Sequence, residues 1–241
     1  MSAFAIIVPC YNEAARLNIA EFTLFARSHP DVEFIMVNDG SSDNTKSRLL
    51  ELQQSSEQFR IVDMTINAGK GEAVRNGLLY AITHQYSIVG YLDADLSTTL
   101  QEFYELKTIA EQKNADYLLG SRIKKIDSKI ERSTTRHLVG RSIATLIDSK
   151  FKLGVYDTQC GAKIFKAALI QQVIATPFFT KWFFDVEILL RIRQLSNNYR
   201  GLEVPLNEWK NVKDSKINIL SFPLVLKEMR TLFKSYKSDS K

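Results

Sequence analysis

Short apolar runs alternate with longer amphipathic stretches along the first half of the chain, and this rhythm constrains the fold more than any other sequence feature. The apolar runs predict strands at 3–8, 33–37, 60–65, 88–92 and 117–119. The stretches between them predict helices at 13–27, from Ser42 or Asp43 to 52, from Gly71 to 84, and from Thr98 or Thr99 to 113. Such alternation predicts an α/β fold, with a mostly parallel, Rossmann-like central sheet and helices on both faces.

The second half of the chain is less regular. Its patterns predict helices at 133–152, 182–195 and 220–236, a strand ending at 165 and a short strand at 202–205. We predict one domain, 1–241, made of a ligand-binding half at 1–125, a second half at 126–216 and a basic amphipathic helix at 217–241. That helix either packs its apolar side on the sheet or lies on an anionic membrane.

Size and composition suit a single α/β domain. The chain has 241 residues, of which 45% are hydrophobic, enough for a large core. Cys10 and Cys160 cannot form a disulfide framework, and three scattered histidines do not make a zinc site. The apolar residues 3–10 are too few to span a bilayer, and no basic segment precedes them. We therefore read them as a first strand and expect a cytoplasmic protein.

Basic residues are concentrated in two segments. Residues 120–170 hold eleven Lys/Arg against four Asp/Glu, and residues 210–241 hold eight against three, within a net charge of +5. This distribution indicates an anionic partner, such as a phosphate group or a lipid headgroup. The sequence contains no recognised nucleic-acid-binding motif, so we expect no nucleic acid partner. The oligomeric state has no signature in the sequence.

Asp93-Ala94-Asp95 directly follows the strand predicted at 88–92. Two carboxylates one residue apart at the end of a strand repel each other and are costly to desolvate, and a divalent cation relieves both penalties. Mg²⁺ or Mn²⁺ prefers such oxygen ligands and completes its coordination with substrate phosphates. We therefore predict a metal site at Asp93 and Asp95, with Asp95 essential to catalysis.

Ligands of open α/β sheets bind at the carboxyl ends of the strands, and four polar loops are predicted at that edge, at 9–13, 38–43, 67–71 and 93–97. Their side chains suit a nucleotide diphosphate: an aromatic ring for the base, acids for the ribose hydroxyls and cations for the diphosphate. The predicted contacts are Pro9, Tyr11, Glu13, Asp39, Gly69, Lys70, Arg75, Asp93 and Ala94.

Four motifs together resemble the inverting family 2 glycosyltransferases of GT-A fold, over about residues 3–125. They are Pro9–Glu13, Val37–Thr45, Asn67–Gly77 and Asp93–Asp95. The second half is similar to the dolichyl-phosphate glucosyltransferase branch at Gly120–Arg122, Asp157–Lys163, Trp182–Glu187, Val204–Pro205, Glu208–Trp209 and Ser215–Lys216. Two features depart from that branch: Ala162 replaces an expected aromatic residue, and the amino-terminal membrane helix of the eukaryotic enzymes does not precede the first strand.

The resemblance implies transfer of a hexose, glucose from UDP-glucose, to the phosphate of a polyprenyl (dolichyl-type) phosphate, with inversion. It implies an acceptor-phosphate site among basic side chains, for which Arg is well suited because it binds phosphate in a bidentate manner. We place that site at Arg122, Arg132, Arg136 and Lys163. Asp185 is the candidate base or sugar contact, ahead of Glu187, and completes a catalytic set with Asp95 and Arg122. Such an acceptor predicts a peripheral protein at the cytoplasmic face of a membrane.

Three other functions fit parts of the sequence. A GDP-mannose-dependent polyprenyl-phosphate mannosyltransferase would share most of the motifs. A phosphotransferase with Asp93 as nucleophile leaves residues 9–13 and 38–45 unexplained. A nucleotide-sugar sensor would bind without turnover and could dispense with Asp185. A dinucleotide-binding oxidoreductase fits poorly, because glycines at 69 and 71 are followed by glycine only at 77, which breaks the fingerprint spacing.

Overall fold

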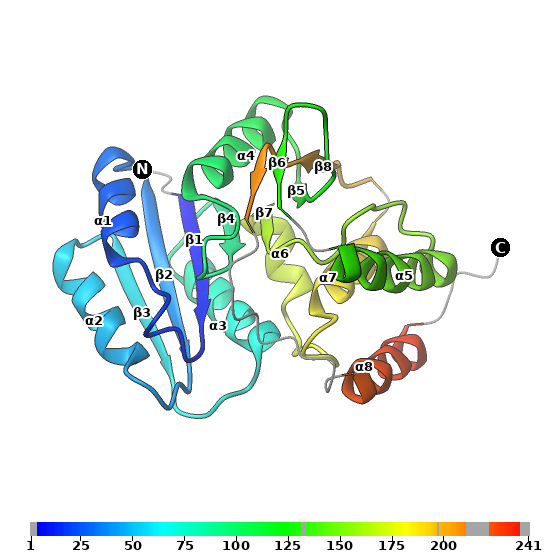
Figure 1. The fold of residues 1–241 in the computed structure, drawn as a ribbon, viewed down its shortest axis with the longest axis horizontal. Coiled ribbons are helices and arrows are strands. Elements are labelled where there is room, and N and C mark those ends of the chain that lie inside the picture. Colours follow the sequence, from blue (N-terminus) through cyan, green and yellow to red (C-terminus); the bar gives the residue numbers. More distant parts are fainter. Residues whose placement is uncertain (1–3, 132–133, 197, 211–221, 237–241) are drawn as a thin grey trace.

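A seven-stranded sheet runs through the molecule (Figure 1). The structure is a computed structural model that describes residues 4–131, 134–196, 198–210 and 222–236. The strands lie in the order β3 (Phe59–Met64), β2 (Val32–Asp39), β1 (Phe4–Cys10), β4 (Ile88–Leu92), β7 (Ala162–Lys166), β5 (Tyr117–Ser121) and β8 (Gly201–Pro205). Only β7 is antiparallel to its neighbours in this sheet. The predicted mostly parallel α/β architecture is confirmed, and strands from both predicted halves share the one sheet.

Helices cover both faces of the sheet because successive residues of a strand point to opposite faces. In β1, Phe4, Ile6 and Val8 pack against α1 (Ile19–Ser28), α2 (Thr45–Ser55) and α4 (Leu100–Gln112). The alternate residues Ala5 and Ile7 pack with α3 (Lys70–Thr83), α6 (Ala167–Val173) and α7 (Phe184–Leu195). The near-continuous apolar run of β1 is therefore explained by burial on both sides.

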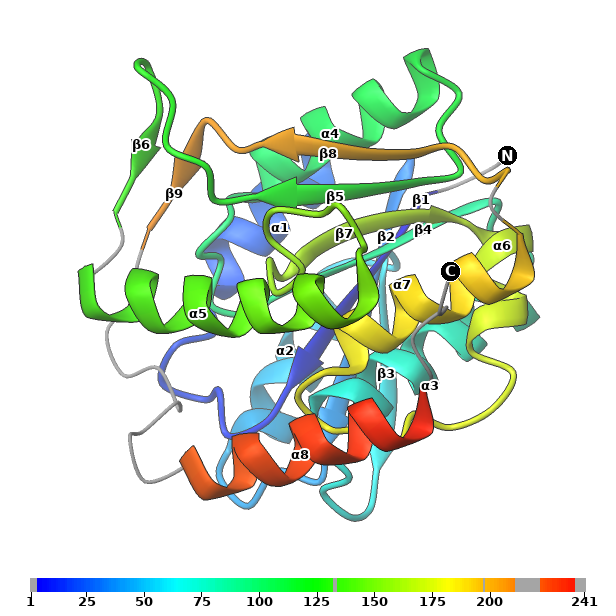
Figure 2. The same ribbon diagram turned by 90° about the vertical axis from the view of Figure 1, so that its right-hand side faces the viewer.

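A third apolar cluster joins α7 to two outer helices, α5 (Thr134–Phe151) and α8 (Phe222–Ser235). Figure 2 shows α5 and α8 on the outside of the molecule, in front of α7. The cluster includes Ile147 of α5, Val186 of α7, and Val225, Met229 and Leu232 of α8. The C-terminal helix thus packs on the protein through one side, whereas two of its leucines, Leu224 and Leu226, are exposed.

Close approach of α3 to the sheet depends on Gly77. A Cβ at this position would overlap the Ile7 side chain and lie 2.9 Å from Cγ2 of Val37. The absence of a side chain lets α3 lie directly against β1 and β2. The first residue of α3, Lys70, is thereby placed at the carboxyl edge of the sheet.

The structure corrects several local expectations. Helix α1 begins at Ile19, not at residue 13, because residues 13–17 form a turn and Asn18 caps the helix through the Glu21 N–H (3.2 Å). Asn44, rather than Ser42 or Asp43, immediately precedes α2. Helix α6 and a small ribbon of β6 (Lys129–Ile130) and β9 (Glu208–Trp209) were not predicted, because elements this short carry too little periodicity.

Candidate active site

The four polar loops meet at one edge of the sheet, as predicted. Paired residues Cys10, Asn38 and Asp63 lie side by side near the carboxyl ends of β1, β2 and β3. The Asn12 N–H donates to Oγ of Ser41 (3.1 Å), which joins the first two loops. Because parallel strands end at the same edge, four loops distant in sequence form one surface.

Asp39 organises the third loop. This buried carboxylate accepts hydrogen bonds from the N–H groups of Ala68 (2.8 Å) and Gly69 (3.0 Å) and from the Asn67 side chain (3.1 Å). Burial raises the pKa of Asp39, and the two backbone donors oppose that rise. Gly69 has a φ of 97°, a conformation that favours glycine, and precedes α3. Asp39 therefore sets the shape of the loop that presents Lys70; its predicted contact with a ribose or base stays a prediction.

In the first loop, the negative charge of Glu13 is balanced by the positive charge of Arg16. Glu13 receives a bidentate contact from Arg16, with Nε at 2.8 Å and an Nη at 2.5 Å from its two oxygens. Tyr11 is 37% exposed just beyond β1, and Pro9 is half-buried within that strand. This places the aromatic ring at the open edge, where a planar base could stack. The predicted donor contacts of Pro9, Tyr11 and Glu13 are untested.

The paired carboxylates lie where β4 ends. Lys70 Nζ is 2.5 Å from Oδ1 of Asp93, while Oδ1 of Asp95 accepts the Ser97 N–H (3.0 Å). Burial raises the pKa of Asp95, and the negative charge of Asp93 raises it further. Burial would lower the pKa of Lys70, but the charges of Asp93, Asp185 and Asp95 outweigh that effect and raise it. The edge therefore has an excess of negative charge that attracts cations.

These residues fit a divalent cation. A cationic ammonium already lies against Asp93, and Asp95 keeps a burial penalty that a positive charge would relieve. Gly161 makes room for the pair, because a Cβ there would overlap the Asp93 carboxylate. Buried Ala94 separates the two acids. No group of three or more His, Cys, Asp or Glu side chains in the described part of the chain could hold a metal, so further ligands would come from substrate.

Arg122, predicted to bind the acceptor phosphate, is paired with Asp157. Its Nε and an Nη each lie 2.7 Å from a carboxylate oxygen of Asp157, and its guanidinium lies 5.5 Å from the ring centre of Trp209. Burial opposes the charge of Arg122, but Asp157 raises its pKa above the usual value. An acceptor phosphate would share this guanidinium with Asp157, and the predicted role stays untested.

Lys163 lies inside the protein, next to Asp185. The whole residue is 0% exposed. Its ammonium lies 2.5 Å from Oδ1 of Asp185 and donates to the Cys160 carbonyl (2.6 Å). The Tyr91 hydroxyl donates to the same Asp185 oxygen. The burial and bonding of Lys163 support a role in holding Asp185 at the start of α7 rather than the predicted contact with an acceptor phosphate.

Two other predicted residues, Arg75 and Glu187, have described contacts with partners other than Asp93 and Asp95. Arg75 donates to Glu72 (2.9 Å) and to the Ile174 carbonyl (2.9 Å), so its described contacts tie α3 to the end of α6. Buried Glu187 accepts hydrogen bonds from Thr180 and so shapes the segment before α7. Arg132 lies outside the described residues. Arg136 lies in α5, but its side chain is outside the described part of the structure.

Three site residues are not among the predicted contacts. The sequence indicates Tyr91 only as part of a strand and Gly161 only as part of the motif at Asp157–Lys163, and it gives no signal for Lys181. Yet Tyr91 holds Asp185, Gly161 lies against Asp93, and the Lys181 side chain lies 3.1 Å from where a Cβ of Gly69 would be. Their roles arise from contacts between segments that are distant in sequence.

Three buried polar atoms near Arg122 and Gly161 have no hydrogen-bond partner within the described structure. They are Oγ of Ser121, Oγ1 of Thr158 and Nε2 of Gln159. In protein interiors such groups are normally satisfied by protein, water or ligand. The residues next to Arg122 and Gly161 thus retain hydrogen-bonding groups that the described residues do not use.

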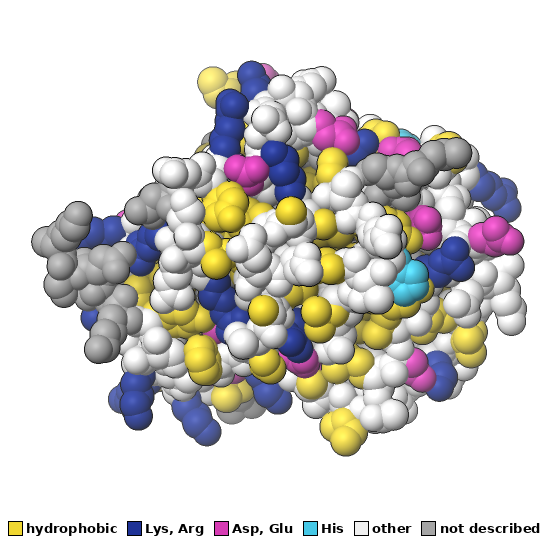
Figure 3. Space-filling model, turned by 180° about the vertical axis from the view of Figure 1, so that it is seen from behind, with side chains coloured by type: hydrophobic (Ala, Val, Ile, Leu, Met, Phe, Trp, Pro, Cys, Tyr) yellow, Lys and Arg dark blue, Asp and Glu magenta, His cyan; other side chains and the backbone are white. Residues whose placement is uncertain are grey.

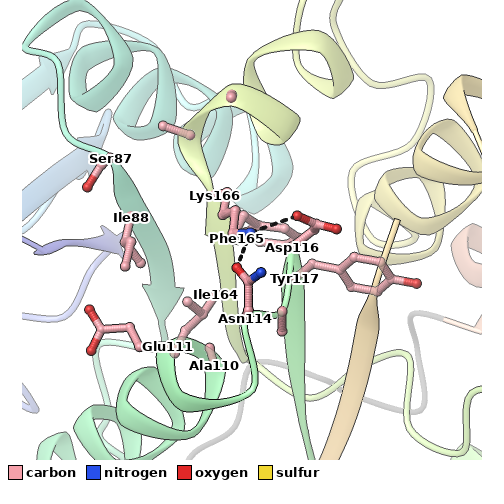
Figure 4. Close-up of a pocket in the computed structure, with 13 residues that line it drawn as sticks. Ser87, Ile88, Ala110, Glu111, Asn114, Asp116, Tyr117, Ile164, Phe165 and Lys166 are labelled. Carbon is pink, nitrogen blue, oxygen red and sulfur yellow. Dashed lines mark hydrogen bonds and ion pairs between the residues drawn. The ribbon is translucent and has the colours of Figure 1, made fainter. Parts of the chain in front are cut away.

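A cavity of about 450 Å³ lies at the opposite, amino-terminal edge of the sheet (Figure 4). It is bounded by the start of β4 and β5 and by the end of β7. Its lysine, Lys166, is bonded to Asn114 (2.8 Å) and Asp116 (3.0 Å), as the dashed lines show. This cavity is separate from the acidic edge, and we assign it no part in the reaction.

The sheet and its acidic carboxyl edge define a glycosyltransferase of GT-A fold. The sequence profile described as glycosyl transferase family 2 matches residues 5–174, and the chain belongs to this family. That assignment accounts for the loops at 9–13 and 38–45, which a phosphotransferase with Asp93 as nucleophile leaves unexplained. In the part of the chain that the structure describes, we find no helix with the length and apolar character needed to span a bilayer.

Within this family, the chain is similar to several dolichyl-phosphate beta-glucosyltransferases. The chain is 30% identical to dolichyl-phosphate beta-glucosyltransferase ALG5A of Trichomonas vaginalis, covering 89% of this chain and 68% of the relative. It is 31% identical to dolichyl-phosphate beta-glucosyltransferase of Dictyostelium discoideum, covering 90% and 69%. The enzyme of the same name from Saccharomyces cerevisiae is 28% identical, covering 98% and 77%.

Solved structures confirm the fold. Glucosyl-3-phosphoglycerate synthase of Mycobacterium tuberculosis superposes with a TM-score of 0.72 at 17% identity, covering 99% of this chain and 82% of that one. A second structure of that enzyme, in complex with Mn²⁺, UDP and glucosyl-3-phosphoglycerate, superposes with a TM-score of 0.70 at 17% identity and the same coverage.

The contact between Gly161 and Asp93 predicts a local effect on metal binding. Gly161→Ala would displace the Asp93 carboxylate, so we expect the Kd for Mn²⁺ in the presence of UDP to rise about tenfold. Calorimetric titration measures this Kd. Gly120→Ala is the matched control, because the atoms nearest to its Cβ would belong to Leu206 and Ala162, at 3.2–3.3 Å, and not to Asp93. Equal Kd values for wild type and Gly161→Ala would contradict the placement of Asp93.

The raised pKa of Asp95 predicts a pH-dependent stability difference. A carboxyl whose folded pKa exceeds its unfolded value adds stability below the unfolded pKa, and this contribution is lost as the pH rises through the folded pKa. Asp95→Asn lacks this titration. Starting near the ordinary value of 3.8 and moving upward, wild type should therefore lose stability relative to the variant. Urea unfolding with a chelator present measures the unfolding free energy of wild type and variant at each pH. A gain in the stability of wild type relative to Asp95→Asn as the pH rises would contradict the raised pKa of Asp95.

Proposed function

We propose that the protein transfers glucose from UDP-glucose to the phosphate of a polyprenyl phosphate of dolichyl type, with inversion at C1. The carrying observation is the pair Asp93 and Asp95 beside Lys70, at the edge where the polar loops meet. The names of the curated relatives support glucose as the sugar and dolichyl phosphate as the acceptor. The proposal assigns the donor to the first half of the chain and the acceptor to the second.

The donor would lie across the carboxyl edge of the sheet. We propose that Tyr11 stacks on the base, that Glu13 and Asp39 contact the base or ribose, and that Lys70 faces the diphosphate. Asp93 and Asp95 would hold Mg²⁺ or Mn²⁺; Mn²⁺ together with UDP in the mycobacterial enzyme supports a divalent ion. When bound, such an ion neutralises the charge that develops on the leaving diphosphate. Lys70 can add to that neutralisation, because its ammonium already lies at this position.

The reaction is a single displacement. An oxygen of the acceptor phosphate forms a bond to C1 of glucose on the face opposite UDP, and the bond between C1 and the β-phosphate oxygen breaks, with its electron pair leaving on UDP. A phosphate monoester has a second pKa of about 6, so it is already anionic at neutral pH. A general base is therefore less important than for a hydroxyl acceptor. We propose that Asp185 orients the sugar, and that Lys163 and Tyr91 hold its carboxylate in place.

The acceptor phosphate would be held by the basic segment of the second half. We propose Arg122, Arg132 and Arg136 as its ligands, with Arg122 sharing its guanidinium between Asp157 and the phosphate. A polyprenyl tail is insoluble in water, so the acceptor would be presented at a membrane surface. We propose peripheral attachment at the cytoplasmic face, where nucleotide sugars are available.

Direct transfer tests the proposed function. Purified protein with radiolabelled UDP-glucose, detergent-dispersed dolichyl phosphate and Mn²⁺ should yield a glucosylated lipid, and a chelator should stop it. Asp95→Ala should lower turnover about 100-fold or more, because charge stabilisation of the leaving group is lost. Its melting temperature, measured on the same sample, should stay close to that of wild type. GDP-mannose as the preferred donor would reassign the sugar, and binding without transfer would identify a sensor.

The contact between Tyr91 and Asp185 predicts a kinetic effect. Tyr91→Phe keeps the buried ring but removes the hydroxyl that donates to Asp185. We expect kcat to fall about tenfold, with both KM values nearly unchanged, because the loss acts on a group positioned for the transition state. Steady-state kinetics with each substrate varied separately measures kcat and the two KM values. Tyr86→Phe, which removes a hydroxyl bonded to Glu33 (2.7 Å), is a matched control; equal effects would contradict the role of Tyr91.

A further inference from the structure

The two sides of α8 differ in chemistry. Its inward side is buried and contains Val225, Met229 and Leu232, together with its acid, Glu228. The charged residues on its exposed side are Lys227, Arg230 and Lys234. At a spacing of three and four residues, these three form one row along the helix. Every charge that the described residues of α8 expose is thus positive.

Large apolar side chains accompany this basic row. Leu224 is 50% exposed and Leu226 is 38% exposed, in the first turns of the helix. By helical geometry they flank the row on its two sides. Near the other end of α8, Phe179 is 61% exposed and its ring lies 6.0 Å from that of Tyr236. Exposed leucine and phenylalanine next to lysine and arginine are typical of surfaces that bind anionic lipid.

The inward side of α8 is fixed to the segment that leads to the active site. Glu228 accepts hydrogen bonds from the N–H groups of Lys181 (3.2 Å) and Trp182 (2.7 Å). The Tyr236 hydroxyl accepts from Arg191 Nε (3.0 Å) and donates to Glu187 (3.1 Å). A surface bound to the outward side of α8 would therefore have a fixed position relative to α7, whose second residue is Asp185.

We propose that the outward side of α8, formed by Lys227, Arg230, Lys234, Leu224 and Leu226, docks on an anionic lipid bilayer. In Figure 3, Lys and Arg side chains protrude at the lower left, the corner where α8 lies. A bilayer offers both partners this side requires, diffuse negative charge for the basic row and hydrocarbon for the leucines. The inference deepens the proposed function, because it names the surface through which a lipid-borne acceptor is met.

Vesicle binding tests the docking surface. The full-length protein is sedimented with vesicles of phosphatidylcholine containing about 30% phosphatidylserine, at about 150 mM salt. We expect K227Q/R230Q/K234Q to bind about 100-fold more weakly than wild type, since each charge contributes about fivefold near such a surface. Wild type should bind pure phosphatidylcholine far more weakly. L224S/L226S should also weaken binding to the anionic vesicles, although less than the triple variant.

A matched variant controls for total charge. K46Q/R60Q/K113Q removes the same number of positive charges from exposed positions on α2, on β3 and after α4. It should bind like wild type. Equal binding by the α8 triple variant and wild type, or an equal loss in both triple variants, would overturn the proposal. Failure of the wild-type protein to bind anionic vesicles would also overturn the proposal. The basic side of α8 would then be tested for binding to an acidic protein.

The docking surface and the proposed function can fail separately. Turnover with a water-soluble, short-chain polyprenyl phosphate requires no bilayer, so the α8 triple variant should keep wild-type turnover with it. Its turnover with dolichyl phosphate in anionic vesicles should fall. Vesicle binding without any transfer would support the docking surface and contradict the proposed acceptor. Transfer without vesicle binding would support the acceptor and contradict the docking surface.

Discussion

Concentrated negative charge at the carboxyl edge of the sheet is the constraint on which the rest of the site depends. Burying a carboxylate is costly unless hydrogen bonds or an opposite charge compensate it. The protein compensates Asp39 with backbone N–H groups, and Asp185 with Lys163 and Tyr91. Asp93 forms an ion pair with Lys70. Asp95 accepts a hydrogen bond from the Ser97 N–H, but the neighbouring negative charge of Asp93 opposes its ionisation. The residual charge is at the acidic pair, and that is the chemical reason to expect a cation there.

Close backbone contacts build this edge as much as charged groups do. The missing side chain at Gly77 lets α3 approach β1 and β2, and a Cβ at Gly71 would lie 2.9 Å from Phe184 of α7. Gly161 makes room for Asp93. Each of these glycines brings two segments together that would otherwise be separated by a side chain. Lys70, Asp93 and Asp185 can therefore share one electrostatic environment although they come from α3, the loop after β4, and α7.

Local motifs made the first half of the chain predictable. The strands were expected within one or two residues, and the four polar loops meet at the predicted edge because parallel strands align their ends. The shortest elements were not predicted, and neither were the distant partners of two basic residues that stay candidates for the acceptor site. The roles of Arg122 and Lys163 depend on Asp157 and Asp185, which are 35 and 22 residues away. An isolated Arg or Lys in a sequence does not reveal whether a buried acid will pair with it.

By itself, the sequence determined the α/β class, the family and the acidic pair, since these are written in periodicity and in contiguous motifs. Tertiary structure alone decided that Arg122 and Lys163 pair with acids, because burial and pairing are properties of contacts between distant segments. It also decided that the C-terminal helix both packs and presents a basic side. The amphipathic pattern left those two outcomes open, and the packing of Val225, Met229 and Leu232 against the α5 and α7 cluster turned Lys227, Arg230 and Lys234 outward.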